Sequence, residues 1–168
     1  MGLLSKKNKP SQKAYAVVTG AGSGIGRSFA LELAKRGGDV ICADIDLSSA
    51  QETVDLIQSM TSTSAYAVHC DVGLKESVHA LAEQAEQLLG HPVTLLINNA
   101  GVGLGSKFDE VSLEDWRWCM HVNLWGVIHG CHYFVPKFKQ QGFGAIINVA
   151  SAAGYTAAPE MTAYNVTK

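Results

Sequence analysis

Short apolar runs alternate with longer amphipathic stretches along most of the chain. The apolar runs predict five strands, at about Ala14–Thr19, Asp39–Ala43, Ala65–Cys70, Val93–Ile97 and Gly144–Val149. Between them, apolar residues recur at helical spacing and predict helices at Gly24–Arg36, from Ser48 or Ser49 to Met60, at Lys75–Leu89, from Ser112 into the region of Pro136, and from about Met161. Strands that alternate with helices in this way favour a parallel sheet covered on both faces, which is a doubly wound α/β fold.

The helix that begins at Ser112 is the longest of these. Pro136 is expected to bend or end it, because proline lacks a backbone N–H and its ring crowds the preceding turn. One apolar stripe runs along this helix, formed by Met120, Leu124, Ile128, Cys131 and Val135.

The first 13 residues lack this patterning. They contain four lysines and no apolar stretch of the kind found in signal peptides, so residues 1–13 are predicted to form a flexible basic tail. Residues 14–168 then form one domain. No run of about 18 apolar residues occurs, and we therefore expect no transmembrane helix.

Composition narrows the possible functions and locations. The formal net charge of -2 gives no reason to expect a nucleic-acid partner. The four cysteines show no C-x-x-C spacing, and Cys42 and Cys70 fall in predicted strands, so we expect buried free thiols rather than disulfides. Free thiols are typical of a reducing compartment and favour a cytoplasmic location.

A glycine-rich turn joins the first strand to the first helix. Thr19, Gly20, Gly24 and Gly26 follow the pattern Thr-Gly-x-x-x-Gly-x-Gly, whereas the commoner G-x-G-x-x-G fails at Ile25. Glycines let a ligand approach the main chain, and the unpaired N–H groups at a helix start favour an anion. The turn therefore predicts a diphosphate site, although a tight turn without a ligand has the same pattern.

An acidic residue ends the second strand. Asp44 lies 24 residues after Gly20, near the spacing expected for a carboxylate that binds the adenosine ribose of a dinucleotide. Such a carboxylate accepts hydrogen bonds from the ribose hydroxyls and repels a 2′-phosphate, so Asp44 favours NAD over NADP. Arg27 weakens this preference slightly. The alternative is that Asp44 and Asp46 only begin a turn.

Three polar residues near the end of the sequence predict proton-transfer chemistry. Tyr164 and Lys168 are four residues apart, so a helix places them on one face, where an ammonium favours the phenolate form of a tyrosine. Ser151 lies 13 residues before Tyr164, just past the fifth strand. Five polar or glycine positions follow strand ends, the edge at which open parallel sheets bind ligands: Gly20, Asp44, Asp71, Asn98 and Ser151.

The length of the chain bears on both fold and activity. A six-stranded dinucleotide-binding fold needs one strand more than the five predicted here, and the last predicted helix has barely begun at Lys168. We therefore expect the sequence to be the N-terminal portion of a longer chain. One alternative to an active enzyme is that this portion alone is inactive.

Together these motifs resemble those of the short-chain dehydrogenase/reductase family over residues 14–168. The glycine turn matches the family's cofactor loop, Asn98-Asn99-Ala100-Gly101 matches its motif after the fourth strand, and Asn123 matches the asparagine of its long helix. Ser151, Tyr164 and Lys168 complete its set of four, while Ala150 stands where many members have a second serine. The resemblance implies a Rossmann-type, NAD-binding catalytic domain that transfers a hydride between nicotinamide and a secondary alcohol or ketone.

The resemblance also implies a role for each matching residue. Tyr164 would be the general acid/base, Lys168 would assist it and bind the nicotinamide ribose, and Ser151 would hydrogen-bond the substrate oxygen. Asn123 would hold a water in a proton relay, although a buried amide satisfied by the backbone fits the sequence equally well. Asn98 would be structural. The implied cofactor-binding residues are Gly20, Ser23, Gly24, Ile25, Gly26, Asp44, Asp71, Val72, Asn99, Ala100, Gly101, Tyr164 and Lys168.

The long helix carries further side chains with possible functions. We expect its three histidines, His121, His129 and His132, to be surface or interface residues rather than metal ligands, because no matching carboxylate accompanies them. In the family this helix packs against its copy, which implies a homodimer or homotetramer acting on a small alcohol or carbonyl compound. Its tryptophans, Trp116, Trp118 and Trp125, are candidates for the core, the substrate wall or a subunit contact, and the glycine-rich segment 101–108 is a candidate lining of the pocket. The competing function is a dinucleotide-binding sensor or scaffold without turnover, which the intact catalytic set disfavours.

Overall fold

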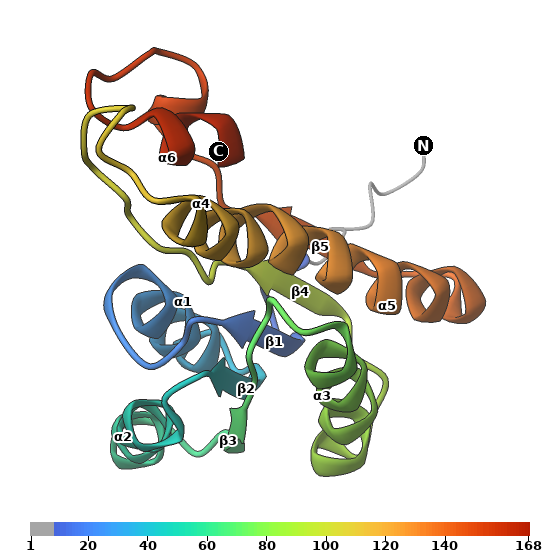
Figure 1. Cartoon of the computed structure of the whole chain (residues 1–168). Helices are drawn as coiled ribbons and strands as arrows, with labels where there is room; N and C mark the ends of the chain where they lie inside the picture. The colour runs from blue at the N-terminus through green and yellow to red at the C-terminus, as the bar shows by residue number, and fades with distance from the viewer. Residues whose placement is uncertain (1–8) are drawn as a thin grey trace, which may run out of the picture.

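Five parallel strands form one sheet in the computed structural model, which describes residues 9–168 (Figure 1). Their order is β3-β2-β1-β4-β5, so the chain crosses from β3 to the far side of β1 before it adds β4. This reversal of strand order opens a crevice at the carboxyl ends of β1 and β4. The strands are β1 (Tyr15–Thr19), β2 (Asp39–Asp44), β3 (Ala65–His69), β4 (Leu95–Asn98) and β5 (Ala145–Asn148).

Helices cover both faces of the sheet, as Figure 1 shows. Alternate strand residues point to opposite faces: Val18 packs in one core cluster with α1 and α2, whereas Val17 packs in another with α3 and α5. This arrangement confirms the predicted doubly wound α/β fold. The helices are α1 (Gly24–Lys35), α2 (Leu47–Met60), α3 (Lys75–Leu89), α4 (Leu113–Met120), α5 (Gly126–Gln141) and α6 (Thr162–Thr167).

Two helix boundaries differ from the prediction. The carboxylate of Asp46 accepts hydrogen bonds from the backbone N–H groups of Ser48 and Ser49, so Asp46 caps α2 and the helix begins before either serine. Hydrogen bonds from Ser49, first of all from its hydroxyl, hold the pKa of Asp46 below its ordinary value. Pro136 lies inside α5, which continues to Gln141 and ends at Gly142 in the left-handed conformation.

A π turn, η1 (His121–Trp125), joins α4 to α5. The apolar stripe noted in the sequence is not the most buried face of this long helix, since Ile128 is 42% exposed. Glycines occupy the buried face where the helix meets its neighbours most closely: a Cβ on Gly126 would lie 2.7 Å from Cγ2 of Val72. The buried residues are Cys119, Asn123, Gly126, Gly130, Phe134 and Phe138.

The predicted basic tail falls partly outside the described residues, which begin at Lys9. Residues 9–13 make a turn in which the N–H of Gln12 donates to the carbonyl of Lys9, and the N–H of Lys13 donates to the carbonyl of Arg36. The bond from Lys13 attaches the end of the predicted tail to the residue that follows α1. Within residues 9–168, none of the helices has both the length and the apolar character that crossing a bilayer requires.

Candidate active site

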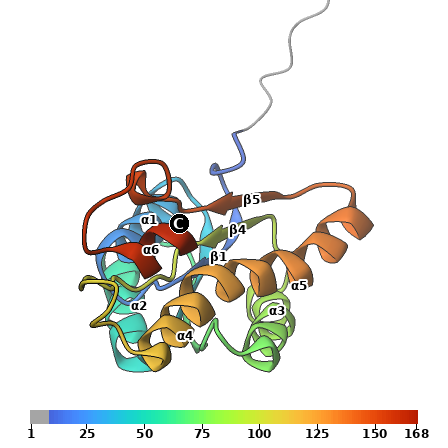
Figure 2. The same ribbon diagram turned by 45° about the horizontal axis from the view of Figure 1, so that its top comes forward.

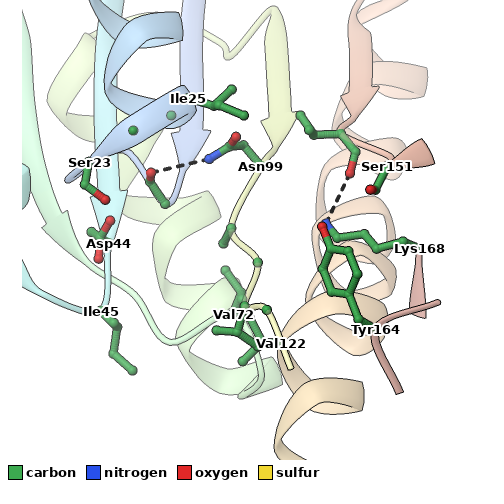
Figure 3. A pocket seen from close by; sticks show the side chains of 18 of the residues that line it. Ser23, Ile25, Asp44, Ile45, Val72, Asn99, Val122, Ser151, Tyr164 and Lys168 are labelled. Carbon is green, nitrogen blue, oxygen red and sulfur yellow. Dashed lines mark hydrogen bonds between the residues drawn. The ribbon is translucent and has the colours of Figure 1, made fainter. Parts of the chain in front are cut away.

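A cavity of about 600 Å³ lies at the carboxyl ends of the strands (Figure 3). It brings together all of the predicted site residues except Asn123. The predicted residues that line it are Gly20, Ser23, Gly24, Ile25, Gly26, Asp44, Asp71, Val72, Asn99, Ala100, Gly101, Ser151, Tyr164 and Lys168.

The glycine turn forms one wall of the cavity and is packed tightly on its inner side. Gly20 has a φ of 66°, and a Cβ on Gly26 would collide with the carbonyl oxygen of Gly20. Gly24 also has a positive φ, of 53°, but a Cβ there would have no atom within 4 Å. The turn therefore needs glycine for its own shape, and its outer surface at the start of α1 is open to a ligand.

Hydrogen bonds between β1 and the segment after β4 hold this turn in place. The hydroxyl of Thr19 accepts from the backbone N–H groups of Asn99 (3.0 Å) and Ala100 (3.1 Å). In return, the side-chain amide of Asn99 donates to the carbonyls of Thr19 (2.9 Å) and Gly20 (3.3 Å). We call this set of bonds the Thr19–Asn99 brace. From the sequence alone, the Thr19 side chain has no predicted role beyond its place in the motif.

Asp44 closes the turn from the end of β2. One of its carboxylate oxygens accepts from the N–H of Gly22 at 2.8 Å, and the other accepts from the N–H of Asp46 at 3.0 Å. A carboxylate has about four acceptor positions, so Asp44 can accept further bonds from a ligand. The side chain of Arg27 is bound elsewhere, to the carbonyl of Gly22, to Thr53 at 2.9 Å and to Glu52 at 3.0 Å.

The segment after β3 forms the wall beyond Asp44. The carboxylate of Asp71 accepts from the N–H of Gly73 at 2.9 Å, and the N–H of Asp71 donates to the hydroxyl of Ser77 at 3.1 Å. Val72 faces the cavity beside Val122 of η1 (Figure 3). The carbonyl of Val72 also lies 2.9 Å from Nδ1 of His129 on α5.

The opposite wall carries three of the predicted catalytic residues. Tyr164 lies in α6, which lies beside α4 (Figure 2), and Lys168 directly follows α6. Nζ of Lys168 is 5.9 Å from the centre of the Tyr164 ring. Nζ of Lys168 donates to the carbonyl of Val149 at 3.3 Å. Ser151 follows β5, and its hydroxyl oxygen accepts from the N–H of Ala153 at 3.2 Å.

Asn123 lies behind the cavity, with 2% of its surface exposed. Its side-chain oxygen accepts from the N–H of Val102 at 2.8 Å, and its amide donates to the carbonyl of Val102 at 2.9 Å and to the hydroxyl of Thr167 at 3.1 Å. Asn123 thus connects the long helix to segment 101–103 and to α6. These contacts agree with the alternative of a buried, satisfied amide, while its part in a proton relay stays a prediction.

Val102 and Gly103, from the glycine-rich segment 101–108, and Trp118 of the long helix line the cavity. Other lining residues were missed from the sequence. Those that extend strands β2, β3 and β5 could have been found by their position at a strand end, but Val122 comes from the long helix and has no such signal. The missed residues are Ile45, Cys70, Val122, Val149 and Ala150.

The remaining candidate chemistry lies in the histidines and cysteines. Within residues 9–168 no three His, Cys, Asp or Glu side chains are grouped as metal ligands. All four cysteines fall in this range and carry free thiols. Burial raises the pKa of the Cys42 thiol to about 12 and that of Cys70 to about 11, so neither is suited to act as a nucleophile.

Comparisons with known proteins cover nearly the whole chain. The sequence profile of the family described as short chain dehydrogenase matches residues 14–168. Cyclohexanol dehydrogenase from Acinetobacter sp. (strain SE19) is 40% identical over 162 residues, which make up 96% of this chain and 63% of that enzyme. The 7alpha-hydroxysteroid dehydrogenase of Escherichia coli (strain K12) is 34% identical over 153 residues, covering 91% of this chain and 59% of that enzyme.

A solved structure shows the same similarity in three dimensions. The crystal structure of a short chain dehydrogenase/reductase from Burkholderia phymatum in complex with NAD superimposes with a TM-score of 0.89 at 39% sequence identity. The match covers 95% of this chain and 56% of that one. This chain therefore spans between 56% and 63% of the length of these three relatives.

Proposed function

Because the chain belongs to the short chain dehydrogenase family, we propose that it is an NAD-dependent oxidoreductase that interconverts secondary alcohols and ketones. One observation carries the proposal: Ser151, Tyr164 and Lys168 line the same cavity as the glycine turn. A sensor or scaffold that only binds a dinucleotide would need the turn but not all three of these side chains.

The cavity has the features that a dinucleotide requires. It combines an open glycine surface at a helix start, a carboxylate at the end of β2, and a volume in the range of small-molecule sites. Gly20–Gly26 would hold the diphosphate, Asp44 the adenosine ribose, and Lys168 the nicotinamide ribose. Asp71 and Val72 would lie against the adenine. Bound NAD would supply the acceptor or donor of the hydride.

The protein's own residues would bind the substrate oxygen and move its proton. The hydroxyl oxygen of Ser151 already accepts from Ala153, so its proton remains available to donate to the substrate oxygen. The phenol of Tyr164 would give or take the proton at that oxygen, and the positive charge of Lys168 would stabilise the phenolate. Exposure of the cavity to solvent lets the proton leave toward water.

A tyrosine variant tests this assignment. Tyr164→Phe removes only the phenolic oxygen, so we expect kcat to fall by about 10²- to 10⁴-fold while the Kd for NAD stays within about two-fold. The assay follows absorbance of NADH with cyclohexanol, a hydroxysteroid and short-chain secondary alcohols as substrates, chosen because two relatives carry such names. Turnover that survives in Tyr164→Phe would contradict the assignment.

The preference for NAD is supported by charge and geometry near the adenosine site. Asp44 would present its carboxylate to the 2′-phosphate of NADP, and the Arg27 guanidinium is bound to Thr53 and Glu52. A phosphate at this position would therefore meet a negative charge without a free guanidinium to balance it.

We extend the proposal to the assembly and location of the protein. A groove of about 510 Å³ on the long helix is lined by exposed or half-exposed apolar side chains, which suits contact with a second copy in a homodimer or homotetramer. The four free thiols support a reducing compartment such as the cytoplasm. The apolar residues of the groove are Phe108, Leu113, Trp116, Met120 and Trp125.

A further inference from the structure

The carbonyl of Val72 receives a hydrogen bond from a residue far along the chain. Nδ1 of His129 lies 2.9 Å from this oxygen, and the two residues are 57 positions apart. A carbonyl oxygen can only accept, so Nδ1 of His129 must carry the proton. The contact thereby fixes the tautomer of the imidazole, with Nδ1 as donor in both its neutral and its charged form.

The packing around His129 leaves little freedom for this contact to slip. One turn earlier on the helix, Gly126 approaches Val72 so closely that a Cβ would lie 2.7 Å from Cγ2 of the valine. The indole of Trp125 lies against the imidazole, with ring centres 5.8 Å apart and planes inclined by 33°. His129 is thus held between the start of α5 and the segment after β3.

The N–H of Cys70 attaches the start of that segment to the carbonyl of Asp44 at 2.8 Å, but the bonds after Cys70 are local. Gly73 and Leu74 donate to Asp71, and Asp71 donates to Ser77, so these bonds shape the turn without attaching it to the long helix. His129 supplies an attachment from outside. Asp71 and Val72 both line the cavity, and they follow β3, which pairs with β2 at the edge of the sheet opposite β5.

We propose that His129 is a positioning residue for the adenine end of the cofactor. By holding the carbonyl of Val72, it fixes the backbone that presents the Val72 side chain and the Asp71 carboxylate to the cavity. This inference rests on the proposed function, in which Asp71 and Val72 lie against the adenine. It gives a role to His129, which the sequence predicts only as a surface or interface residue.

Variants at His129 test the proposal by separating the two ends of the cofactor. His129→Leu keeps a side chain of similar bulk but has no donor, and we expect it to weaken binding of both AMP and NAD by about 3- to 10-fold in calorimetry. His129→Asn places an amide N–H near the position of Nδ1 and is expected to restore most of the affinity. His132→Leu, on an exposed histidine of the same helix, is the matched control and should bind AMP as the unmutated protein does.

A cofactor without adenine gives the decisive comparison. With reduced nicotinamide mononucleotide as hydride donor, we expect His129→Leu and the unmutated protein to have the same kcat/KM for a ketone within about two-fold. If His129→Leu lowers kcat/KM by the same factor with this mononucleotide and with NADH, the substitution has a general structural effect and the proposal is overturned. Equal AMP affinity in His129→Leu and the unmutated protein would overturn it as well, while leaving the proposed function intact.

Two further measurements use only the unmutated protein, so they do not depend on whether the variants fold. If the unmutated protein binds no AMP, both the adenine site and this inference fail. The ¹⁵N NMR spectrum of the unmutated protein should show the Nδ1–H tautomer at His129, with a shift on addition of AMP. The Nε2–H tautomer would contradict the hydrogen bond to Val72, even if His129→Leu does not fold.

Discussion

Asp44 has two tasks in the site, and they can be separated by substitution. Its carboxylate holds the glycine turn through the N–H of Gly22, and it presents negative charge to the expected position of the adenosine ribose. An amide of the same shape can still accept the hydrogen bond but carries no charge. The preference between NAD and NADP therefore reports on charge, while the overall affinity also reports on the shape of the turn.

We expect the unmutated protein to bind NAD at least about tenfold more tightly than NADP, because the 2′-phosphate would be repelled by Asp44. Asp44→Asn should narrow this gap mainly by improving the affinity for NADP. Asp44→Ala should also narrow it but weaken both cofactors, since the bond to Gly22 is lost as well. Calorimetric Kd values for both cofactors check this, and equal affinities in the unmutated protein would contradict it.

The buried thiol of Cys42 links the stability of the fold to alkaline pH. Burial raises its pKa from the ordinary value of 9.0 to about 12, so the folded protein keeps this proton at a pH where the unfolded chain releases it. The sign follows directly: the stabilisation is complete below pH 9 and is lost between about pH 9 and 12, at up to roughly 1.4 kcal/mol per pH unit.

Urea unfolding between pH 8 and 10.5 measures this slope. Cys42→Ala removes the titrating group, and its unfolding free energy should fall less steeply with pH than that of the unmutated protein. Cys131→Ala is the matched control, because Cys131 is not fully buried and should leave the slope unchanged. Identical slopes for Cys42→Ala and the unmutated protein would refute the linkage.

At the scale of elements, the bounds and the buried face of a helix could be predicted from the sequence where apolar residues mark that face. In α3, Val78, Leu81 and Ala85 recur at helical spacing and are buried, and the predicted bounds of Lys75–Leu89 are confirmed. The long helix buries two glycines and an amide as well as Cys119, Phe134 and Phe138, and hydropathy does not detect the glycines or the amide. Gly126 and Gly130 let this helix approach the side chains of Val72 and Asn98, which lie far away in the sequence. Neither its buried face nor its π turn therefore follows from local sequence.

In the site, too, residues placed by local sequence patterns could be predicted, whereas those placed by contacts between distant segments could not. Strand ends, the glycine motif and the Tyr164/Lys168 spacing located the cavity, because these features follow from element order. The position of Asn123 behind the cavity did not follow, since its bonds to Val102 and Thr167 join segments distant in the chain. The cap at Asp46 was missed for a simpler reason: two serines followed it, and each is also a good cap.

The close packing of α5 on β4 leads to a test of stability. A Cβ on Gly130 would collide with the side-chain oxygen of Asn98, which donates through its amide to Asn148 at 2.8 Å. We expect Gly130→Ala to lower the free energy of unfolding by about 1–3 kcal/mol, despite the higher helix propensity of alanine. Gly103→Ala is the control, because a Cβ there meets open space. Unfolding in urea measures both, and an unchanged or raised stability of Gly130→Ala would contradict the packing argument.

At the scale of the whole molecule, the groove on α4 predicts self-association. Leu113 is 67% exposed at the first position of α4, so Leu113→Glu adds charge to the groove without disturbing the core and suits the positive end of the helix dipole. We expect light scattering to show a dimer or tetramer for the unmutated protein and a shift toward monomer for Leu113→Glu. Leu88→Glu, on an exposed leucine of α3, should leave the assembly unchanged. A monomeric unmutated protein would rule out the proposed homo-oligomer.

The Thr19–Asn99 brace joins residues 80 positions apart, and this separation sets the order in which the protein gains affinity for its cofactor. A nascent chain that has emerged from the ribosome only as far as α3 already contains the entire glycine motif and Asp44. It lacks the partner that locks the motif into shape, so we expect it to capture no nucleotide. We expect affinity for the nucleotide to appear only once β4 has been synthesised and has paired with β1. A nucleotide that binds at that stage would stabilise the pairing of β1 with β4.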